Sequence, residues 1–254
     1  MQNCTGCLKK NMWQSTKWVD WNTGARIWRC RNCKNYQTEL PAQGLRIPPK
    51  ILYIDIETAL ISVDVYDLYI PGKRINKDMI NRRRFVINWA AAWVNPQTYE
   101  IKKILTGVVT EREAKQQDDK RIVQEIFNLM DEADYLCWHN GDSFDHKILK
   151  WRFLFHGMGY PSQSKTVDTF KLSGQGKPES RGLEYISTEL GGNRKKGLDA
   201  DEWRKIVRAS TPAEERTKLL RKSSRYCRGD VQEGVHVLKH YVRAIEQSGK
   251  IVFR

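Results

Sequence analysis

The sequence predicts a mixed α/β domain, in which helices flank a sheet, behind a small N-terminal module that carries two cysteine pairs. Three observations support this fold class. Strand patterns come first, along residues 50–109; helix and strand patterns then alternate toward the end of the chain; and residues 1–38 are rich in Cys, Trp and basic side chains. Strands followed by alternating helices and strands are typical of α/β proteins with a mixed sheet.

The length of the chain limits what it can contain. Its 254 residues suffice for one full α/β core and one small module. They leave no room for a polymerase or helicase engine as well. We therefore expect the protein to act alone or on a partner supplied in trans.

The basic charge favours an acidic polymer as the partner. The chain has 44 Lys and Arg against 30 Asp and Glu, a net charge of +14. Half of that excess, +7, lies in the first fifty residues, which hold nine basic and two acidic side chains. Such a field is typical of nucleic-acid-binding proteins, although a soluble basic protein without such a partner fits the charge equally well.

The sequence predicts a cytoplasmic protein. No stretch of eighteen apolar residues is present, and the N-terminus MQNCTGCLKK has no apolar signal-peptide core. Thiols stay reduced in the cytoplasm, so the six cysteines are not expected to form a disulfide framework. Cys137 and Cys227 lie in apolar surroundings and are expected to be buried thiols.

The other four cysteines predict a structural zinc site. Cys4 and Cys7 form one Cys-x2-Cys pair, and Cys30 and Cys33 form a second. Two such pairs supply four thiolates for a tetrahedral Zn²⁺ and leave no position open for water. The 22 residues between the pairs slightly exceed the usual spacing of zinc ribbons. A redox-active Cys-x2-Cys is the alternative, but no thioredoxin-like pattern accompanies it.

We place the domain boundaries by composition. Residues 1–38 are the predicted zinc ribbon, residues 39–49 are a linker rich in proline, and residues 50–254 are the α/β domain. Four tryptophans of the ribbon, which alternate with basic residues, have the character of a single-strand-binding surface; they are Trp13, Trp18, Trp21 and Trp28. The alternative is that some of them form the small core of the ribbon.

The α/β domain is predicted to open with three strands. Residues 50–59 (KILYIDIETA) are apolar on both faces, as in a buried strand. Residues 83–94 and 100–109 predict two more strands, joined by a turn at Asn95 and Pro96.

Helices and strands are then expected to alternate. Thr110 and Glu113 predict a capping box that opens one amphipathic helix ending near Ala133. A strand over 134–140, a helix over 144–157 and a strand over 166–172 follow. Residues 182–192 end at a glycine pair, and a long helix is expected to open at Thr211 and Pro212.

Acidic residues recur at three places in this pattern. Asp55 and Glu57 are two apart on a predicted strand, so their carboxylates lie on one face, where burying them is costly unless a cation neutralises them. Asp145 begins a predicted helix directly after a strand. Tyr226 and Asp230 are four apart on the long helix and therefore share one face, at the margin of its apolar stripe.

These residues resemble a known family. In this order, D-x-E, N-x3-F-D and Y-x3-D resemble the three exonuclease motifs of the DEDDy branch of the RNase H-like superfamily, over residues 50–245. The segment WHNGDSFD is similar to the second motif of family B DNA polymerase proofreading domains. Together with INWAAAWV and TVDTFKL, it also looks like stand-alone exonucleases encoded by bacteriophages. Ser143 departs from the polymerase motif, which commonly has Asn there.

The resemblance implies an RNase H-like mixed sheet and a two-metal 3′→5′ exonuclease. It implies that two Mg²⁺ or Mn²⁺ ions are held by Asp55, Glu57, Asp145 and Asp230, and that Tyr226 orients the attacking water. Hard oxygen ligands suit these ions. The implied product is a nucleoside 5′-monophosphate. Asp142 and Asp168 are expected to be a turn residue and a structural residue.

The resemblance also implies partners and a location. The expected substrate is nucleic acid, in particular single-stranded DNA or a 3′ end, with a replication or recombination protein as a possible partner in trans and the host cytoplasm as the location of a phage-encoded enzyme. Two alternatives stay open: an exoribonuclease, and a zinc-ribbon nucleic-acid-binding adaptor with an inactive nuclease fold. Inactive members of such families usually lose an acidic ligand, and none is missing here.

Overall fold

The computed structural model of the chain describes residues 12–19, 26–30, 36–38, 48–65, 76–193, 197–249 and 252–253. In the first three ranges it describes the backbone and the side chain of Arg29. Those three ranges form a small antiparallel sheet of three strands: β1 (Met12–Val19), β2 (Arg26–Cys30) and β3 (Tyr36–Thr38).

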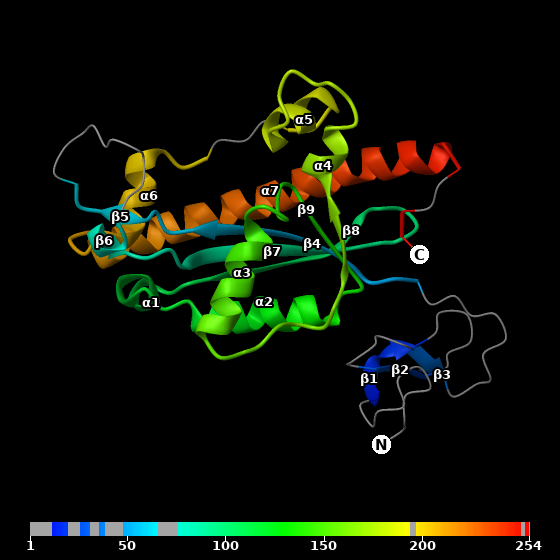
Figure 1. Cartoon of the computed structure of the whole chain (residues 1–254), viewed down its shortest axis with the longest axis horizontal. Coiled ribbons are helices and arrows are strands. Elements are labelled where there is room, and N and C mark those ends of the chain that lie inside the picture. Colours follow the sequence, from blue (N-terminus) through cyan, green and yellow to red (C-terminus); the bar gives the residue numbers. More distant parts are fainter. Residues whose placement is uncertain are drawn as a thin grey trace.

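A five-stranded mixed sheet forms the centre of the larger domain (Figure 1). Its order is β10-β9-β4-β7-β8; β4 pairs antiparallel with β7 and parallel with β9. This arrangement confirms the predicted mixed sheet. The strands are β4 (Ile51–Thr58), β7 (Val86–Val94), β8 (Ile101–Val108), β9 (Tyr135–Trp138) and β10 (Lys165–Asp168). A two-stranded sheet of β5 (Ser62–Val63) and β6 (Ile80–Arg82), with a 3-10 turn at Lys77–Met79, follows β4.

Helices cover both faces of this sheet, with the long helix α7 on one face and α2 and α3 on the other (Figure 1). The described helices are α1 (Glu111–Gln116), α2 (Lys120–Glu132), α3 (Asp145–Phe155), α4 (Thr169–Ser173), α5 (Leu183–Glu189), α6 (Ala200–Val207) and α7 (Ala213–Gln247). No helix among the described residues is long and apolar enough to cross a membrane.

Alternate residues of β4 face two separate cores, because successive side chains of a strand point to opposite faces. Leu52 and Ile54 pack with the α2 and α3 side, whereas Tyr53 packs against α7. Helix α7 can approach Tyr53 because it carries glycine at position 234; a Cβ there would lie 2.2 Å from the Tyr53 hydroxyl oxygen. This close approach brings the polar side chains of α7 to β4.

Several predicted elements differ from the structure. The helix expected from Thr110 to Ala133 is two helices, because Gln117 adopts a left-handed backbone (φ 58°) that ends α1. The capping box of Thr110 and Glu113 is present as predicted. The strand expected over 166–172 ends at Asp168, whose carboxylate accepts a hydrogen bond from the Phe170 amide and so caps α4.

The long helix begins one residue later than expected. Pro212, not Thr211, is its N-cap, and no side chain caps it. Helix α6 was not predicted at all, although Asp199 and Glu202 form a capping box. That D-x-x-E spacing was a readable signal in the sequence.

Arg29, the one side chain described in the small N-terminal sheet, is buried against the larger domain. Arg29 of β2 places Nη2 2.6 Å from the Asp134 carboxylate, and its other terminal nitrogen donates to the Glu132 carbonyl oxygen. The second carboxylate oxygen of Asp134 accepts a hydrogen bond from the Lys50 amide at 2.9 Å. Asp134 therefore joins β2 to the start of β4.

Candidate active site

Strand β4 carries the first two acidic residues of the site. Asp55 and Glu57 lie on the face that α7 covers, and both are half-buried. The strand reaches the centre of the sheet because its apolar residues pack on both sides, so these two carboxylates are held away from bulk water.

Asp145 fills a gap in the hydrogen-bond ladder of the sheet. The parallel pairing of β4 with β9 ends at Tyr53 and Cys137. The amide of Ile56, beyond that point, donates instead to the Asp145 carboxylate at 3.0 Å. Because a buried amide without a partner is costly, this bond fixes Asp145 beside Asp55.

Helix α7 supplies the two remaining residues of the site, Tyr226 and Asp230. The carboxylates of Asp55, Glu57 and Asp230 have oxygen atoms that all lie within 4.8 Å of one another. The Tyr226 hydroxyl, one turn earlier on α7, hydrogen-bonds with Asp230. Three carboxylates at this separation can hold a divalent cation.

The electrostatics of the site call for positive charge. Burial, followed by the charges of Asp145, Glu57 and Asp230, raises the pKa of Asp55 well above its usual value. Burial also raises the pKa of Asp145 to about 7, although the hydrogen bond from Ile56 opposes this shift. Without a cation, the site therefore binds protons near neutral pH, and a metal ion would displace them.

Tyr226 is a protonated hydrogen-bond donor in this environment. Burial first, and then the negative charges of Asp230 and Glu57, raise its pKa. The loop before α6 packs on the ring; a Cβ at Gly197 would lie 3.1 Å from a ring carbon of Tyr226. The ring is thus held in place between this loop and the acidic cluster.

Two further contacts at the site were not foreseen. The Cys227 thiol, predicted to be buried and found fully buried, donates to the Asp55 carboxylate with Sγ 3.2 Å from the oxygen. Asn88, directly opposite Glu57 on β7, donates to the Ser223 hydroxyl of α7 at 2.8 Å. The signal for the second contact was a single polar residue within the apolar strand VINWAAAWV.

Asp142 and Asp168, which were expected to be a turn residue and a structural residue, both make structural contacts. Asp168 accepts hydrogen bonds from the amides of Asn140, Asp142 and Phe170, and so holds the loop after β9 against α4. Asp142 accepts a hydrogen bond from the Trp138 indole and pairs with Lys171.

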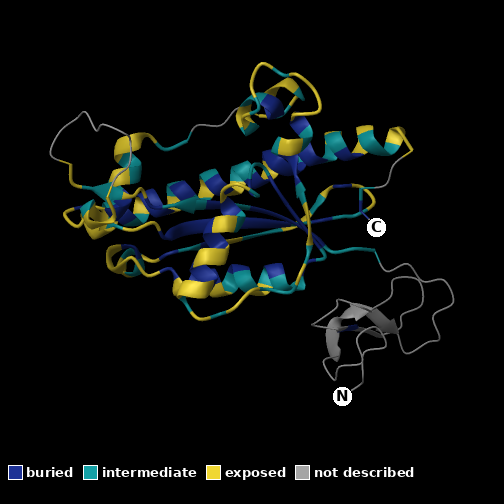
Figure 2. Cartoon of the chain, viewed as in Figure 1, coloured by how far each residue is buried: buried dark blue, intermediate teal, exposed yellow. Residues whose placement is uncertain are grey.

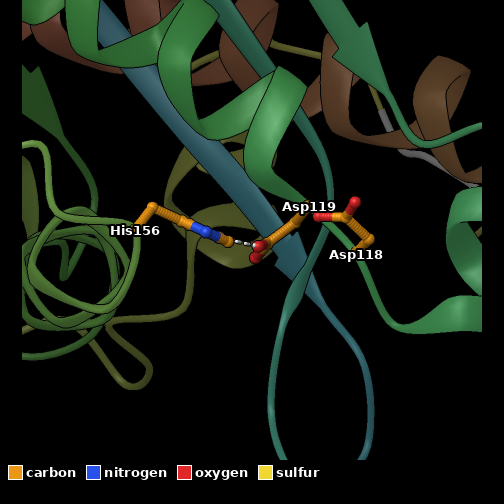
Figure 3. Close-up of side chains that lie close together, drawn as sticks. All are labelled: Asp118, Asp119 and His156. Atoms are coloured by element: carbon orange, nitrogen blue, oxygen red, sulfur yellow. Dashed lines mark hydrogen bonds and ion pairs between the residues drawn. The ribbon is translucent and has the colours of Figure 1, made fainter.

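A second cluster of metal-binding residue types has a different explanation. Asp118, Asp119 and His156 lie together, and Figure 3 shows His156 pointing at Asp119. The Asp119 carboxylate is buried and already accepts hydrogen bonds from Arg152, from the Val86 amide at 2.7 Å and from His156 Nε2 at 2.6 Å. The guanidinium neutralises it, so this cluster is a structural network and not a metal site.

The side chains of the four predicted zinc ligands lie outside the described part of the structure. Cys4, Cys7 and Cys33 are not among the described residues, and of Cys30 the backbone alone is described, at the end of β2.

The raised pKa of Asp145 leads to a prediction about stability. The pKa of this carboxyl is about 7 in the folded protein and about 3.9 in the unfolded chain. Its contribution to stability is therefore fully present at pH values below the unfolded pKa and is lost as the pH rises through the folded pKa. In EDTA, the free energy of unfolding should fall by about 1 kcal/mol between pH 6 and pH 8, which lowers the melting temperature by about 2–4 °C. Calorimetry at the two pH values measures this difference.

Asp145→Asn is the matched variant for this measurement. Its amide oxygen still accepts the Ile56 amide, but the side chain cannot ionise. The difference between pH 6 and pH 8 should shrink in the variant. An equal difference in both proteins would show that another group titrates.

An acidic cluster on the central strand of a mixed sheet flanked by helices defines this protein as one with an RNase H-like nuclease fold. The sequence profile of the RNase H superfamily matches residues 84–242, and the chain belongs to that superfamily. No curated protein sequence matches the chain.

Many solved structures resemble the chain, 141 of them significantly. One is the family B DNA polymerase from the hyperthermophilic archaeon Pyrobaculum calidifontis, with 14% sequence identity and a TM-score of 0.49. The match covers 91% of this chain and 28% of the polymerase chain. At this identity and score, the likeness carries no conclusion about function.

Proposed function

We propose that this protein is a metal-dependent 3′→5′ exonuclease of the DEDDy type that degrades single-stranded DNA to nucleoside 5′-monophosphates. The observation that carries the proposal is that Asp55, Glu57 and Asp230, from a strand and a helix far apart in the sequence, bring their carboxylates within 4.8 Å of one another. Asp145 and Tyr226 complete the set beside them.

In the proposed mechanism, the four carboxylates would hold two Mg²⁺ or Mn²⁺ ions. When bound, such ions stabilise the charges that develop on the attacking and leaving oxygens of a phosphodiester. The chain's own residues bind the ions and orient the attacking water. The Tyr226 hydroxyl, kept protonated by its surroundings, orients the attacking water, and the Cys227 thiol and the Ile56 amide hold Asp55 and Asp145 in position.

The N-terminal residues 1–38 are proposed to be a zinc ribbon with Cys4, Cys7, Cys30 and Cys33 as ligands, joined by the linker 39–49 to the nuclease domain. Its basic character supports a role in gripping nucleic acid. Docking of a replication or recombination protein is the alternative role for this module. A phage origin is proposed from the sequence resemblance alone.

Oligonucleotides labelled at either end test the direction and the substrate. With Mg²⁺, a 5′ label should give a ladder that shortens progressively, and a 3′ label should appear at once as a mononucleotide. EDTA should stop both reactions. DNA and RNA of the same sequence separate the deoxyribonuclease from the exoribonuclease. Fragments of intermediate length that carry the 3′ label would contradict a 3′→5′ exonuclease.

Tyr226→Phe tests the role assigned to the tyrosine. The ring should stay packed against the loop at Gly197, but the hydroxyl that orients the water is lost. We expect kcat to fall by about a hundredfold, with little change in the affinity for Mg²⁺. Tyr241→Phe, about 22 Å further along α7, is the control and should keep wild-type kcat. Near-normal kcat in Tyr226→Phe would contradict the assignment.

A further inference from the structure

Helix α3 presents an exposed aromatic and basic surface that the proposed chemistry does not use. Trp151 is 63% exposed, Phe155 55% and Tyr160, just beyond the helix, 56%. Large apolar side chains gathered on one surface usually mark a contact site. Figure 2 shows exposed positions along the outward side of α3.

These residues form one continuous surface, here called the α3 strip: Lys147, Lys150, Trp151, Leu154, Phe155 and Tyr160. At about 100° per residue, the five helical members fall within an arc of about 140°. The opposite side of the helix, including Leu149 and Phe153, is fully buried in the core.

The strip begins beside the acidic cluster. Asp145 is the first residue of α3, so Trp151 lies about 9 Å and Phe155 about 15 Å further along the helix axis. Phe144, which precedes Asp145, is partly exposed, and the Arg84 guanidinium lies 5.4 Å from its ring centroid. A nucleic-acid strand that leaves the acidic cluster along α3 therefore passes aromatic and basic side chains along its path.

The charge of the strip selects its occupant. From residue 147 to residue 160 the sequence contains lysine, arginine and histidine but no acidic residue. The Lys150 ammonium lies 5.8 Å from the centroid of the Tyr160 ring. Aromatic rings among cations bind unpaired bases by stacking and phosphates by charge, a combination that suits a single strand of nucleic acid.

The Phe155 ring is also held in place before any ligand binds. The Arg152 guanidinium lies 4.3 Å from the centroid of the Phe155 ring, and the His156 ring meets it edge-on at 5.1 Å. Both of these residues are fixed by the buried Asp119 carboxylate. The Asp119 network thus supports the Phe155 ring from behind, which reduces the entropy lost when a base stacks on it.

We propose that the α3 strip binds the uncleaved part of a single-stranded nucleic acid whose end lies at the acidic cluster. This inference rests on the proposed function, because it names the path of that substrate. It assigns Trp151 as the principal stacking residue and Lys147 and Lys150 as phosphate contacts.

Binding of labelled single strands to the full chain in EDTA tests the proposal. Trp151→Ala should weaken binding of a twelve-nucleotide strand by about tenfold, within the range of stacking on one base. The loss should be much smaller for a nucleoside 5′-monophosphate, which occupies the acidic cluster alone and does not extend along α3. Trp151→Phe should restore most of the affinity, since a smaller ring still stacks.

A second variant tests the charge. Lys147→Gln combined with Lys150→Gln should make the slope of log K against log salt shallower by about 1.4, or about 0.7 for each lost phosphate contact. Lys103→Gln combined with Arg243→Gln, both exposed on other elements, is the matched control and should leave the slope unchanged.

Three outcomes would overturn the proposal: wild-type affinity of Trp151→Ala for the long strand, an equal loss for the nucleoside 5′-monophosphate, or an unchanged salt slope in the double lysine variant. Hydrolysis of the long strand by the wild-type protein with Mg²⁺ is measured separately. Its absence would defeat the proposed function, while the binding results in EDTA would still decide on the strip.

Discussion

Replacing Asp55 or Asp230 by alanine should abolish hydrolysis while leaving the protein folded. Each of these two carboxylates contributes an oxygen to the cluster with Glu57, in which the oxygens all lie within 4.8 Å of one another. Bound metal ions supply several kcal/mol of transition-state stabilisation, and about 4 kcal/mol corresponds to about a thousandfold in rate. We therefore expect a loss of at least about a thousandfold in the turnover of a labelled single strand with Mg²⁺.

The stability of these variants should move in the other direction. Asp55 has a raised pKa because it is buried among Asp145, Glu57 and Asp230, so removing its charge relieves repulsion in the metal-free protein. The melting temperature in EDTA should be unchanged or higher, and added Mg²⁺ should raise it less than in the wild type.

Two controls sharpen the result. Asp55→Asn keeps an oxygen that accepts the Cys227 thiol, which separates loss of charge from loss of this contact. Asp201→Asn, on the exposed face of α6, removes a carboxylate far from the cluster in sequence and should keep full activity. Near-normal turnover of Asp55→Ala or Asp230→Ala would refute the active site proposed here.

Cys30→Ser should release zinc from the N-terminal module. Four thiolates form the proposed site, and a structural zinc site supplies much of the folding free energy of so small a unit. The zinc content, measured by atomic absorption, should fall from about one ion per chain to nearly none. Cys137→Ala, which alters a buried thiol of the core, is the control and should retain zinc.

The same variant should loosen the contact between the two sheets. Cys30 directly follows Arg29 in β2, and Arg29 pairs with Asp134 of the larger domain. Hydrogen exchange at the Lys50 and Tyr135 amides, which lie at this contact, should report the change. Cleavage of short strands should continue, because the carboxylates belong to β4, α3 and α7. Zinc retained at full stoichiometry would count against coordination by four cysteines.

Periodicity predicted the local elements of the larger domain well. The short apolar run of residues 50–59 and the helical spacing around Asp230 are properties of short segments, and local stereochemistry fixes both. Strand β4 and helix α7 therefore formed where they were expected, with Asp55 and Glu57 on one face and Cys227, Val231 and Val235 buried.

The predicted boundaries of helices and strands were wrong where contacts between segments far apart in the sequence override local conformational preference. Gln117 ends α1 early, and the next helix starts at Lys120 because Asp119 turns inward to bind the Val86 amide and Arg152. Nothing within residues 110–133 shows that an arginine 33 residues later pairs with Asp119. A pattern within one window contains no information about such a partner.

By itself, the sequence determined the mixed α/β class, the order of its main elements and the acidic residues expected to form the site. Only the tertiary structure decided that Asp145 replaces a strand in bonding the Ile56 amide, that Cys227 donates to Asp55, and that Asn88 and Ser223 join β7 to α7. The physical reason is range: backbone sterics and side-chain period act over a few residues, whereas the satisfaction of buried polar groups depends on every segment that packs around them.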